Sequence, residues 1–416
     1  MLRLCFIIIL FPLLLLPGAC TGERSPTEEL SEGRPLEESD EEQGPEIDLY
    51  REEAARIALP MDNALLAAQC LLSGLDSRAF FSDTMKSLLE RVPVGGIILF
   101  RYNLSGSKDD TTSFLNEVSN FVTPVAGVPP FMAVDHEGGM VHRFGPELTR
   151  LPPPLSFWEM SQREGEAAAL EAVENLARLS GEELVSLGIS LNLAPVAEIL
   201  SPENQAFLAT RSYGPDPCFT EKAASAFIRG MEAAGIACTI KHFPGNSAED
   251  PHYSHSEIPL DLEALDAMIQ PFRNIIRELH VPALMVSHSV VPAIDAERNG
   301  SLSPAMIGWI REGLGFSGIV VADDFSMAAV TARGISAEEA AVQALIAGAD
   351  MIMCWPSNMV SIHEAILSAL EEERLSRERL LEAAERIIAE KLRFGLMEQV
   401  TVNNEQRTIN NDEYPL

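Results

Sequence analysis

The sequence predicts an α/β fold, a closed (β/α)8 barrel of the TIM type that forms a single domain. Seven short runs are nearly continuously apolar, which is typical of parallel strands buried on both faces. Segments with helical periodicity separate these runs, and the alternation extends over residues 50–397. Seven strand–helix units leave one barrel strand unplaced, so a doubly wound open sheet is the alternative.

The seven expected strands follow one another at regular intervals: 95–100, 130–135, 189–194, 236–241, 281–287, 318–323 and 349–354. The last expected helix, 377–392, repeats its apolar residues at a spacing that places them on one face. No GxGxxG or GxxxxGK[ST] motif follows any of these strands, so the sequence gives no indication of nucleotide binding.

The composition excludes several functional classes. The chain has 416 residues, of which 46% are hydrophobic, enough to bury a large core. Its net charge of −32 argues against a nucleic-acid partner and against electrostatic docking on anionic lipid. Six cysteines without a CxxC pair are too few for a disulfide scaffold and indicate no structural zinc site.

The N-terminus is predicted to be a signal peptide, residues 1–19. Arg3 precedes an apolar run over 4–17, shorter than the roughly 20 residues of a spanning helix. The small residues before Cys20 resemble a bacterial lipoprotein processing site, which implies lipidation of Cys20. Ordinary secretion with cleavage after Ala19 is the alternative. The expected location is outside the cytoplasm, in the periplasm or on the outer membrane, with the lipid as the only membrane contact.

Two polar segments flank the predicted domain. Residues 20–49 are rich in Glu, Ser, Pro and Gly and have few large apolar side chains. Such a segment cannot bury enough surface to offset its ordering entropy, so a flexible acidic tether is expected after the lipidated cysteine. Residues 398–416 are expected to form a polar C-terminal tail.

Charged and imidazole side chains gather just beyond the expected strand ends. They are Asp135, His136, Glu137, Arg143, Lys241, His242, His288, Asp323 and Asp324. Ionisable groups are costly to bury without partners, and barrel enzymes place their active sites at the C-terminal ends of the strands. The sequence therefore predicts an active site at this end of the barrel.

Four segments carry a family resemblance: VDHEGGMVHRFG (134–145), RSYG (211–214), KHFPGN (241–246) and VADDFSM (321–327). They resemble the motifs of family 3 glycoside hydrolases, above all the single-domain bacterial β-N-acetylhexosaminidase branch. The motifs occur in the family's order and the resemblance covers residues 50–397. The second domain of many β-glucosidases in the family is therefore not expected after residue 397.

The resemblance implies a role for each matching residue. Asp323 would be the nucleophile that forms a covalent glycosyl-enzyme, and Asp324 a neighbour such as a helix cap. His288 would support the site without a direct catalytic part. The sugar would be bound by Asp135, Arg143, Arg211, Lys241 and His242, although a structural salt bridge is the alternative role for Arg211.

The resemblance also implies an unusual general acid/base, a histidine paired with an aspartate two residues earlier on the loop after the fourth of these strands. An imidazole titrates near neutral pH, so it can protonate the leaving oxygen and then deprotonate water. Asp250 and His252 preserve the Asp-x-His spacing and are the preferred pair. His255 fits better when counted back from Pro259, and a degenerate loop is the third possibility. Asn246 and Met140 also depart from the family pattern.

These expectations combine into one prediction. The chain would be a retaining exo-β-N-acetylglucosaminidase that removes terminal N-acetylglucosamine from peptidoglycan fragments or chitooligosaccharides. No metal or organic cofactor is implied, and a monomer is expected. The alternatives are a β-glucosidase or β-xylosidase of the same fold, a phosphorolytic variant, and a non-catalytic glycan-binding lipoprotein.

Overall fold

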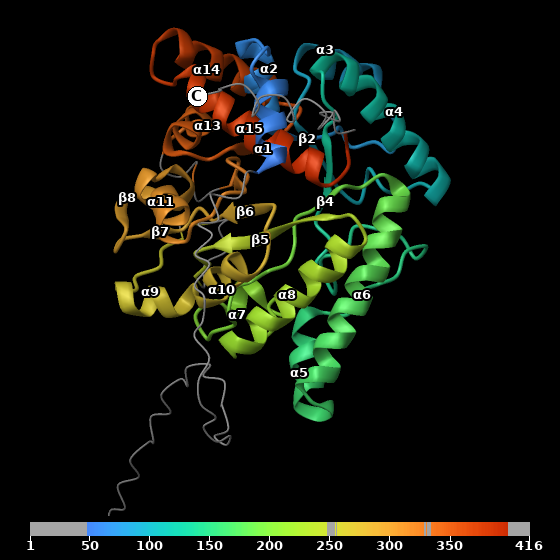
Figure 1. The fold of residues 1–416 in the computed structure, drawn as a ribbon, viewed down its shortest axis with the longest axis vertical. Helices are drawn as coiled ribbons and strands as arrows, with labels where there is room; N and C mark the ends of the chain where they lie inside the picture. The colour runs from blue at the N-terminus through green and yellow to red at the C-terminus, as the bar shows by residue number, and fades with distance from the viewer. Residues whose placement is uncertain (1–47, 248–253, 255, 328–329, 331–333, 398–416) are drawn as a thin grey trace, which may run out of the picture. The chain divides into compact units, whose positions relative to one another are not determined.

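The computed structural model describes residues 48–247, 254, 256–327, 330 and 334–397. Eight parallel strands form a closed barrel in the order β1-β10-β9-β6-β5-β4-β3-β2 (Figure 1). The strands are β1 (Leu71–Gly74), β2 (Gly96–Leu99), β3 (Phe131–Val134), β4 (Leu191–Asn192), β5 (Ala237–Phe243), β6 (Ala283–Val286), β9 (Ile319–Ala322) and β10 (Met351–Cys354). Closure of the sheet confirms the (β/α)8 prediction and excludes the open doubly wound sheet.

All seven expected strands are present, and β1 is the strand that the sequence did not place. It starts two residues after α2 (Asn63–Gln69), and Cys70 is the only residue between them. The apolar residues of the helix therefore continue into those of the strand, and no Gly, Pro, Asn or Asp between them indicates a turn. Pairing of β1 with both β2 and β10 closes the barrel.

Helices cover the outside of the barrel. The longer ones are α1 (Leu49–Ala58), α3 (Asp83–Arg91), α4 (Lys108–Ala126), α5 (Pro154–Glu164), α6 (Glu166–Leu187), α8 (Pro217–Ala233), α10 (Gln270–Glu278), α13 (Ala337–Ala347), α14 (Met359–Glu371) and α15 (Arg377–Arg393). The shorter ones are α7 (Gln205–Leu208), α9 (Leu262–Met268) and α11 (Pro304–Gly308). Helices α6 and α8 pack side by side in Figure 1. The expected helix 377–392 is confirmed as α15.

An antiparallel pair, β7 (Val290–Val291) and β8 (Asp295–Asn299), interrupts the pattern between β6 and β9. None of the helices in the described part of the chain is long and apolar enough to cross a membrane.

The core has two parts, one inside the barrel and one between the barrel and its helices. Inside, side chains such as Leu72, Phe131 and Val321 are fully buried and fill the lumen. Helix α15 adds Ile387 to this cluster. The lumen is therefore packed, and binding of a ligand is left to the loops at the C-terminal ends of the strands.

Candidate active site

A cavity of about 380 Å³ lies at the C-terminal ends of the barrel strands. The predicted residues that line it are Asp135, Arg143, Arg211, Lys241, His242, His288, Asp323 and Asp324. Glu137, Asn246, Phe100, Phe207, Trp355 and several methionines complete the lining. With Glu137, the fold thus brings together nine charged or imidazole side chains that the sequence had singled out, from segments nearly 190 residues apart. Met140 is 66% exposed and is not among the lining residues.

An alternating chain of charges forms one wall of the cavity. The Lys241 Nζ lies 2.8 Å from Asp135 Oδ1 and 2.7 Å from Glu137 Oε1. Arg143 Nη2 donates to the other Asp135 oxygen at 3.1 Å. Arg211 donates to both Glu137 oxygens at 2.8 Å. Arg211 therefore lines the cavity and also makes a salt bridge, the alternative role expected for it from the sequence.

Burial would raise the pKa of Glu137, but Arg211 and Lys241 outweigh burial and hold it well below its ordinary value. The pKa of Asp135 is lowered in the same sense, because Lys241 and Arg143 outweigh its burial. Both carboxylates are therefore ionised at neutral pH. An ionised Asp135 is an acceptor-only group, suited to hydroxyl groups of a ligand.

Glu198 is a functional residue that the candidate list missed. Its side chain is 1% exposed. It accepts hydrogen bonds from His242 Nδ1 at 2.7 Å and from the backbone N–H and side-chain amide of Asn246 at 2.7 and 2.9 Å. His242 Nδ1 is thus engaged by this carboxylate, and Nε2 is the ring nitrogen that is left for a ligand. The signals were the LNLAPVAE motif, which ends at Glu198, and the unusual Asn246.

Asp323 follows β9 directly, at the mouth of the barrel. Its Oδ1 accepts the backbone N–H of Asp324 at 2.8 Å. His288 lies 3.0 Å from the Asp324 carbonyl through Nε2 and 2.7 Å from Ser301 Oγ through Nδ1. A carbonyl only accepts, so Nε2 carries the hydrogen, and burial lowers the pKa of His288 so that it stays neutral. His288 thus braces the turn that presents Asp323.

The comparisons with known proteins agree with this geometry. Residues 67–389 match the model of the glycosyl hydrolase family 3 N-terminal domain. A protein of Idiomarina loihiensis named beta-hexosaminidase is 32% identical over 315 residues, which are 74% of this chain and 91% of that protein. The chain belongs to glycosyl hydrolase family 3.

Solved structures of the family have the same fold. A family 3 β-N-acetylglucosaminidase from Paenibacillus sp. str. FPU-7 superposes with a TM-score of 0.75 at 31% identity, over 83% of this chain and 65% of that chain. NagZ from Neisseria gonorrhoeae, solved in complex with N-trifluoroacetyl-D-glucosamine, gives a TM-score of 0.64 at 25% identity, over 77% of this chain and 97% of that one. The chain is therefore a glycoside hydrolase that acts on carbohydrate.

Some residues predicted for this family 3 enzyme lie outside the described residues. These are Asp250, His252 and His255, which follow β5 in the sequence, and Cys20. Their roles remain predictions. Within the described residues, no group of three or more His, Cys, Asp or Glu side chains is arranged to hold a metal ion.

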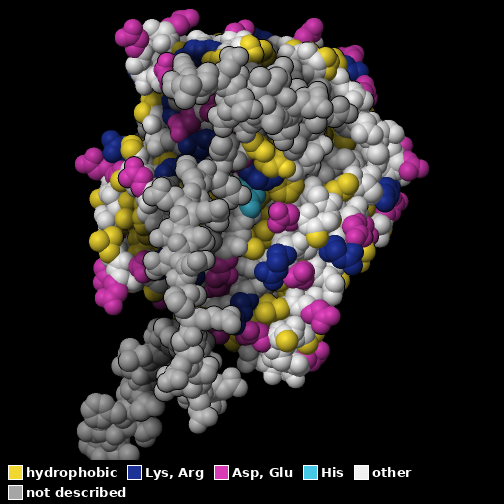
Figure 2. Space-filling model, viewed as in Figure 1, with side chains coloured by type: hydrophobic (Ala, Val, Ile, Leu, Met, Phe, Trp, Pro, Cys, Tyr) yellow, Lys and Arg dark blue, Asp and Glu magenta, His cyan; other side chains and the backbone are white. Residues whose placement is uncertain are grey.

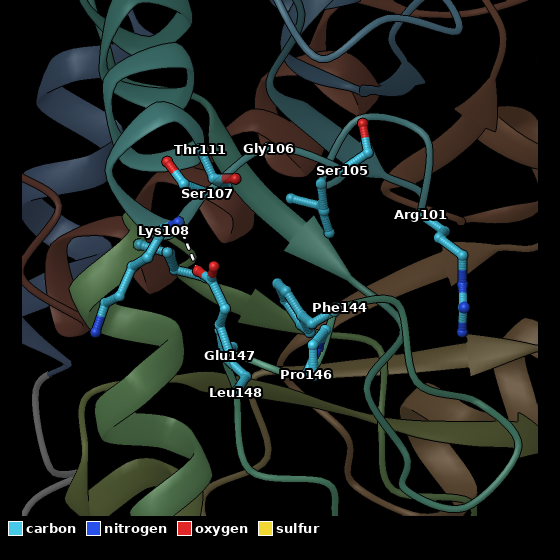
Figure 3. Close-up of a pocket in the computed structure, with 13 residues that line it drawn as sticks. Arg101, Ser105, Gly106, Ser107, Lys108, Thr111, Phe144, Pro146, Glu147 and Leu148 are labelled. Carbon is cyan, nitrogen blue, oxygen red and sulfur yellow. Dashed lines mark hydrogen bonds between the residues drawn. The ribbon is translucent and has the colours of Figure 1, made fainter.

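A second cavity, of about 310 Å³, lies between the loops after β2 and β3 (Figure 3). Glu147 accepts the backbone N–H of Lys108 at 2.9 Å, at the start of α4. Arg101 donates to the carbonyl of His142 at 2.8 Å, next to the cavity-lining Arg143. Neighbouring residues of one segment thus line both cavities, Arg143 the first and Phe144 the second.

The surface of the family 3 domain carries charges of both signs. In Figure 2, Asp and Glu side chains are spread over the described face, with Lys and Arg side chains among them.

Proposed function

We propose that this enzyme is a retaining exo-β-N-acetylglucosaminidase acting on terminal N-acetylglucosamine of peptidoglycan fragments or chitooligosaccharides. The observation that carries the proposal is the position of Asp323 in one cavity with Asp135, Lys241 and His242. The names of the relatives, beta-hexosaminidase and β-N-acetylglucosaminidase, support the N-acetyl sugar. The N-trifluoroacetyl-D-glucosamine bound by the Neisseria protein supports it too.

Asp323 attacks the anomeric carbon of the bound sugar while the glycosidic oxygen leaves with a proton. The bond from Asp324 N–H holds one carboxylate oxygen, which orients the group for attack through the other. Water then cleaves the glycosyl ester, so the configuration at the anomeric carbon is retained. An ionised carboxylate also stabilises the positive charge that develops at this carbon.

Asp135, Lys241 and His242 bind the hydroxyl groups of the sugar. Asp135 accepts hydrogen bonds, while the Lys241 ammonium donates a third hydrogen beyond the two that Asp135 and Glu137 take. Such charge-assisted bonds in a half-enclosed cavity fix the sugar against Asp323. Arg211 lines the cavity while it pairs with Glu137, and its remaining N–H groups can donate to the sugar.

The general acid/base is proposed to be His252 with Asp250. The imidazole protonates the leaving oxygen in the first step and removes a proton from water in the second. Asp250 would hold the tautomer and stabilise the imidazolium, as a carboxylate does in a catalytic triad.

A panel of 4-nitrophenyl glycosides tests the function. N-acetylglucosaminide is expected to be hydrolysed faster than glucoside or xyloside, and Asp323→Ala to lower turnover by about 10³-fold or more. A 5-fluoro derivative of N-acetylglucosaminyl fluoride, which keeps the 2-acetamido group, is expected to label Asp323. Wild-type protein that turns over none of the panel contradicts the hydrolase and favours a glycan-binding protein. Formation of a sugar 1-phosphate in phosphate buffer would identify phosphorolysis.

Two matched variants test the acid/base. His252→Ala is expected to lower turnover of substrates with poor leaving groups far more than of 4-nitrophenyl substrates, because a good leaving group needs no proton. His255→Ala is the control and is expected to stay close to wild type. A larger loss of turnover in His255→Ala than in His252→Ala would assign the general acid/base role to His255.

Lipidation at Cys20 is proposed to tether the enzyme to a membrane facing the periplasm. Wild type is expected in the membrane fraction and in the detergent phase, and Cys20→Ser in the soluble fraction. Equal partitioning of the two proteins would contradict the anchor and leave ordinary secretion.

A further inference from the structure

Trp355 occupies a fixed place in the cavity wall. It follows β10 directly and lines the cavity that contains Asp323. Its indole N–H donates to Asp324 Oδ2 at 2.8 Å. The ring of Phe100 lies 5.1 Å away between centroids, tilted by 37°. Gly74, at the end of β1, leaves the space for the indole, because a Cβ there would lie 2.8 Å from Cε3 of the ring.

Both oxygens of the Asp324 carboxylate accept hydrogen bonds in this arrangement. Its Oδ1 accepts the backbone N–H of Ser326 at 2.8 Å, and its Oδ2 accepts the hydroxyl of Ser326 at 2.6 Å besides the indole. Three donors therefore occupy the two oxygens of this carboxylate, which adjoins Asp323 in the chain.

Asp324 also connects the indole to the nucleophile. Its backbone N–H bonds to the Asp323 carboxylate, while its side chain holds Trp355. Its carbonyl is braced by His288. The positions of the nucleophile and of the aromatic ring are thus set by one residue.

We propose that Asp324 is a positioning residue that fixes the Trp355 indole as a stacking platform for the apolar face of the sugar beside Asp323. The inference rests on the proposed function for the identity of the sugar. A β-configured pyranose with equatorial substituents presents a flat face of C–H groups, and an indole is the largest aromatic surface that a side chain can offer to it. Fixing the ring before binding lowers the entropy cost of ordering it with the ligand.

Four variants test the coupling by steady-state kinetics on 4-nitrophenyl N-acetylglucosaminide. Trp355→Ala is expected to raise KM by several-fold to about tenfold with a smaller change in kcat. Asp324→Ala and Trp355→Phe each break the hydrogen bond and are expected to raise KM by less than Trp355→Ala. Asp324→Asn keeps an acceptor oxygen for the indole and is expected to recover most of the loss.

The double variant Asp324→Ala/Trp355→Phe is expected to be no worse than the more affected single variant, because both remove the same interaction. Two outcomes would overturn the proposal. One is a double variant in which the free-energy losses of Asp324→Ala and Trp355→Phe, calculated from KM, simply add. The other is a loss of kcat in Asp324→Asn as deep as in Asp323→Ala, which would make Asp324 catalytic.

Tryptophan fluorescence separates this inference from the proposed function because it needs no turnover. Titration of wild type with N-acetylglucosamine is expected to quench the emission, and Trp355→Phe is expected to lose the quenching while Trp158→Phe keeps it. Quenching of this kind in a protein that hydrolyses no glycoside would contradict the hydrolase and support the platform. An active enzyme whose KM is unchanged in Trp355→Ala would overturn the platform and leave the hydrolase standing.

Discussion

Two buried lysines at opposite ends of the barrel have opposite electrostatic environments. Lys241, at the C-terminal end, lies between Asp135 and Glu137, and these carboxylates outweigh burial and raise its pKa. Lys391, on α15, donates to the Gln69 side-chain oxygen at 2.8 Å and lies 5.5 Å from the Phe131 ring centroid. Burial lowers the pKa of Lys391 to about 7.

The difference shows that burial alone does not decide the charge of a lysine. Desolvation acts in the same direction on both amines, and the neighbouring carboxylates reverse the result at one end only. At the C-terminal end the charge is retained beside a cavity, where it can bind a ligand. Near Gln69 and Phe131, which mark the N-terminal ends of the strands, the amine packs into the core. This agrees with barrels in general, in which the C-terminal end carries function and the other end stability.

The largest effect is expected from Lys241→Met. The change leaves Asp135 and Glu137 with one cationic partner fewer and removes a sugar ligand, so both stability and activity fall. Unpairing a buried ion pair costs about 3–5 kcal/mol of unfolding free energy. For the protein that remains folded, kcat/KM on 4-nitrophenyl N-acetylglucosaminide is expected to drop by about 10²-fold. Urea unfolding and steady-state kinetics measure the two effects.

The matched control is Lys222→Met on α8. Lys222 pairs with Glu166 at 2.7 Å, but both side chains are nearly half exposed. An exposed pair contributes at most about 1 kcal/mol, so stability and kcat/KM are expected to stay near wild type. Equal losses in the two variants would contradict the role given to the cavity network.

The comparison also shows what the sequence could predict. Apolar strand runs and polar residues at their ends were enough to predict the barrel and to place Lys241 with Asp135 and Asp323. The burial of Lys391 and Gln69 could not be predicted, because a single polar residue in an amphipathic helix ordinarily lies on its exposed face. The strand β1 was missed because no turn residue separates it from α2.

Within the site, the sequence could not predict the partner of each group. Glu198 reaches His242 across more than forty residues of chain, and the pairing of β4 with β5 brings the two segments together. The same holds for Asp324, whose contact with Trp355 spans two neighbouring strands. Residue type and strand position predict membership of a site, whereas hydrogen-bond pairing depends on register and rotamers.

A smaller effect, on the pH dependence of stability, is expected from Lys391→Met. Between pH 7 and the ordinary lysine pKa of 10.5, the unfolded chain binds a proton that the folded chain lacks, so the contribution of Lys391 to stability rises with pH. Below pH 7 the folded protein carries the full desolvation cost of the charged Lys391 amine. Lys391→Met is therefore expected to be more stable than wild type by about 1 kcal/mol at pH 7, because the loss of the Gln69 partner offsets part of the gain. The urea midpoints of Lys391→Met at pH 6.5, 8 and 9.5 are expected to vary less than those of wild type. Midpoints that change with pH equally in the two proteins would contradict the lowered pKa of Lys391.

The smallest effect is expected from Gln69→Glu, which gives Lys391 the kind of partner that Lys241 already has. The fully buried Gln69 has no hydrogen-bond partner for its Nε2 in the described structure, so the exchange sacrifices no observed bond at that atom. A carboxylate at this position is expected to raise the pKa of Lys391 and to remove the rise in stability between pH 7 and 9.5. Stability at pH 7 is expected to change by less than about 1 kcal/mol, because the desolvation cost of the new pair offsets its attraction. Gln69→Leu, which removes the acceptor without adding charge, is expected to keep the pH dependence. A Gln69→Glu profile that follows the Gln69→Leu profile would show that neighbouring carboxylates do not account for the difference between the two lysines.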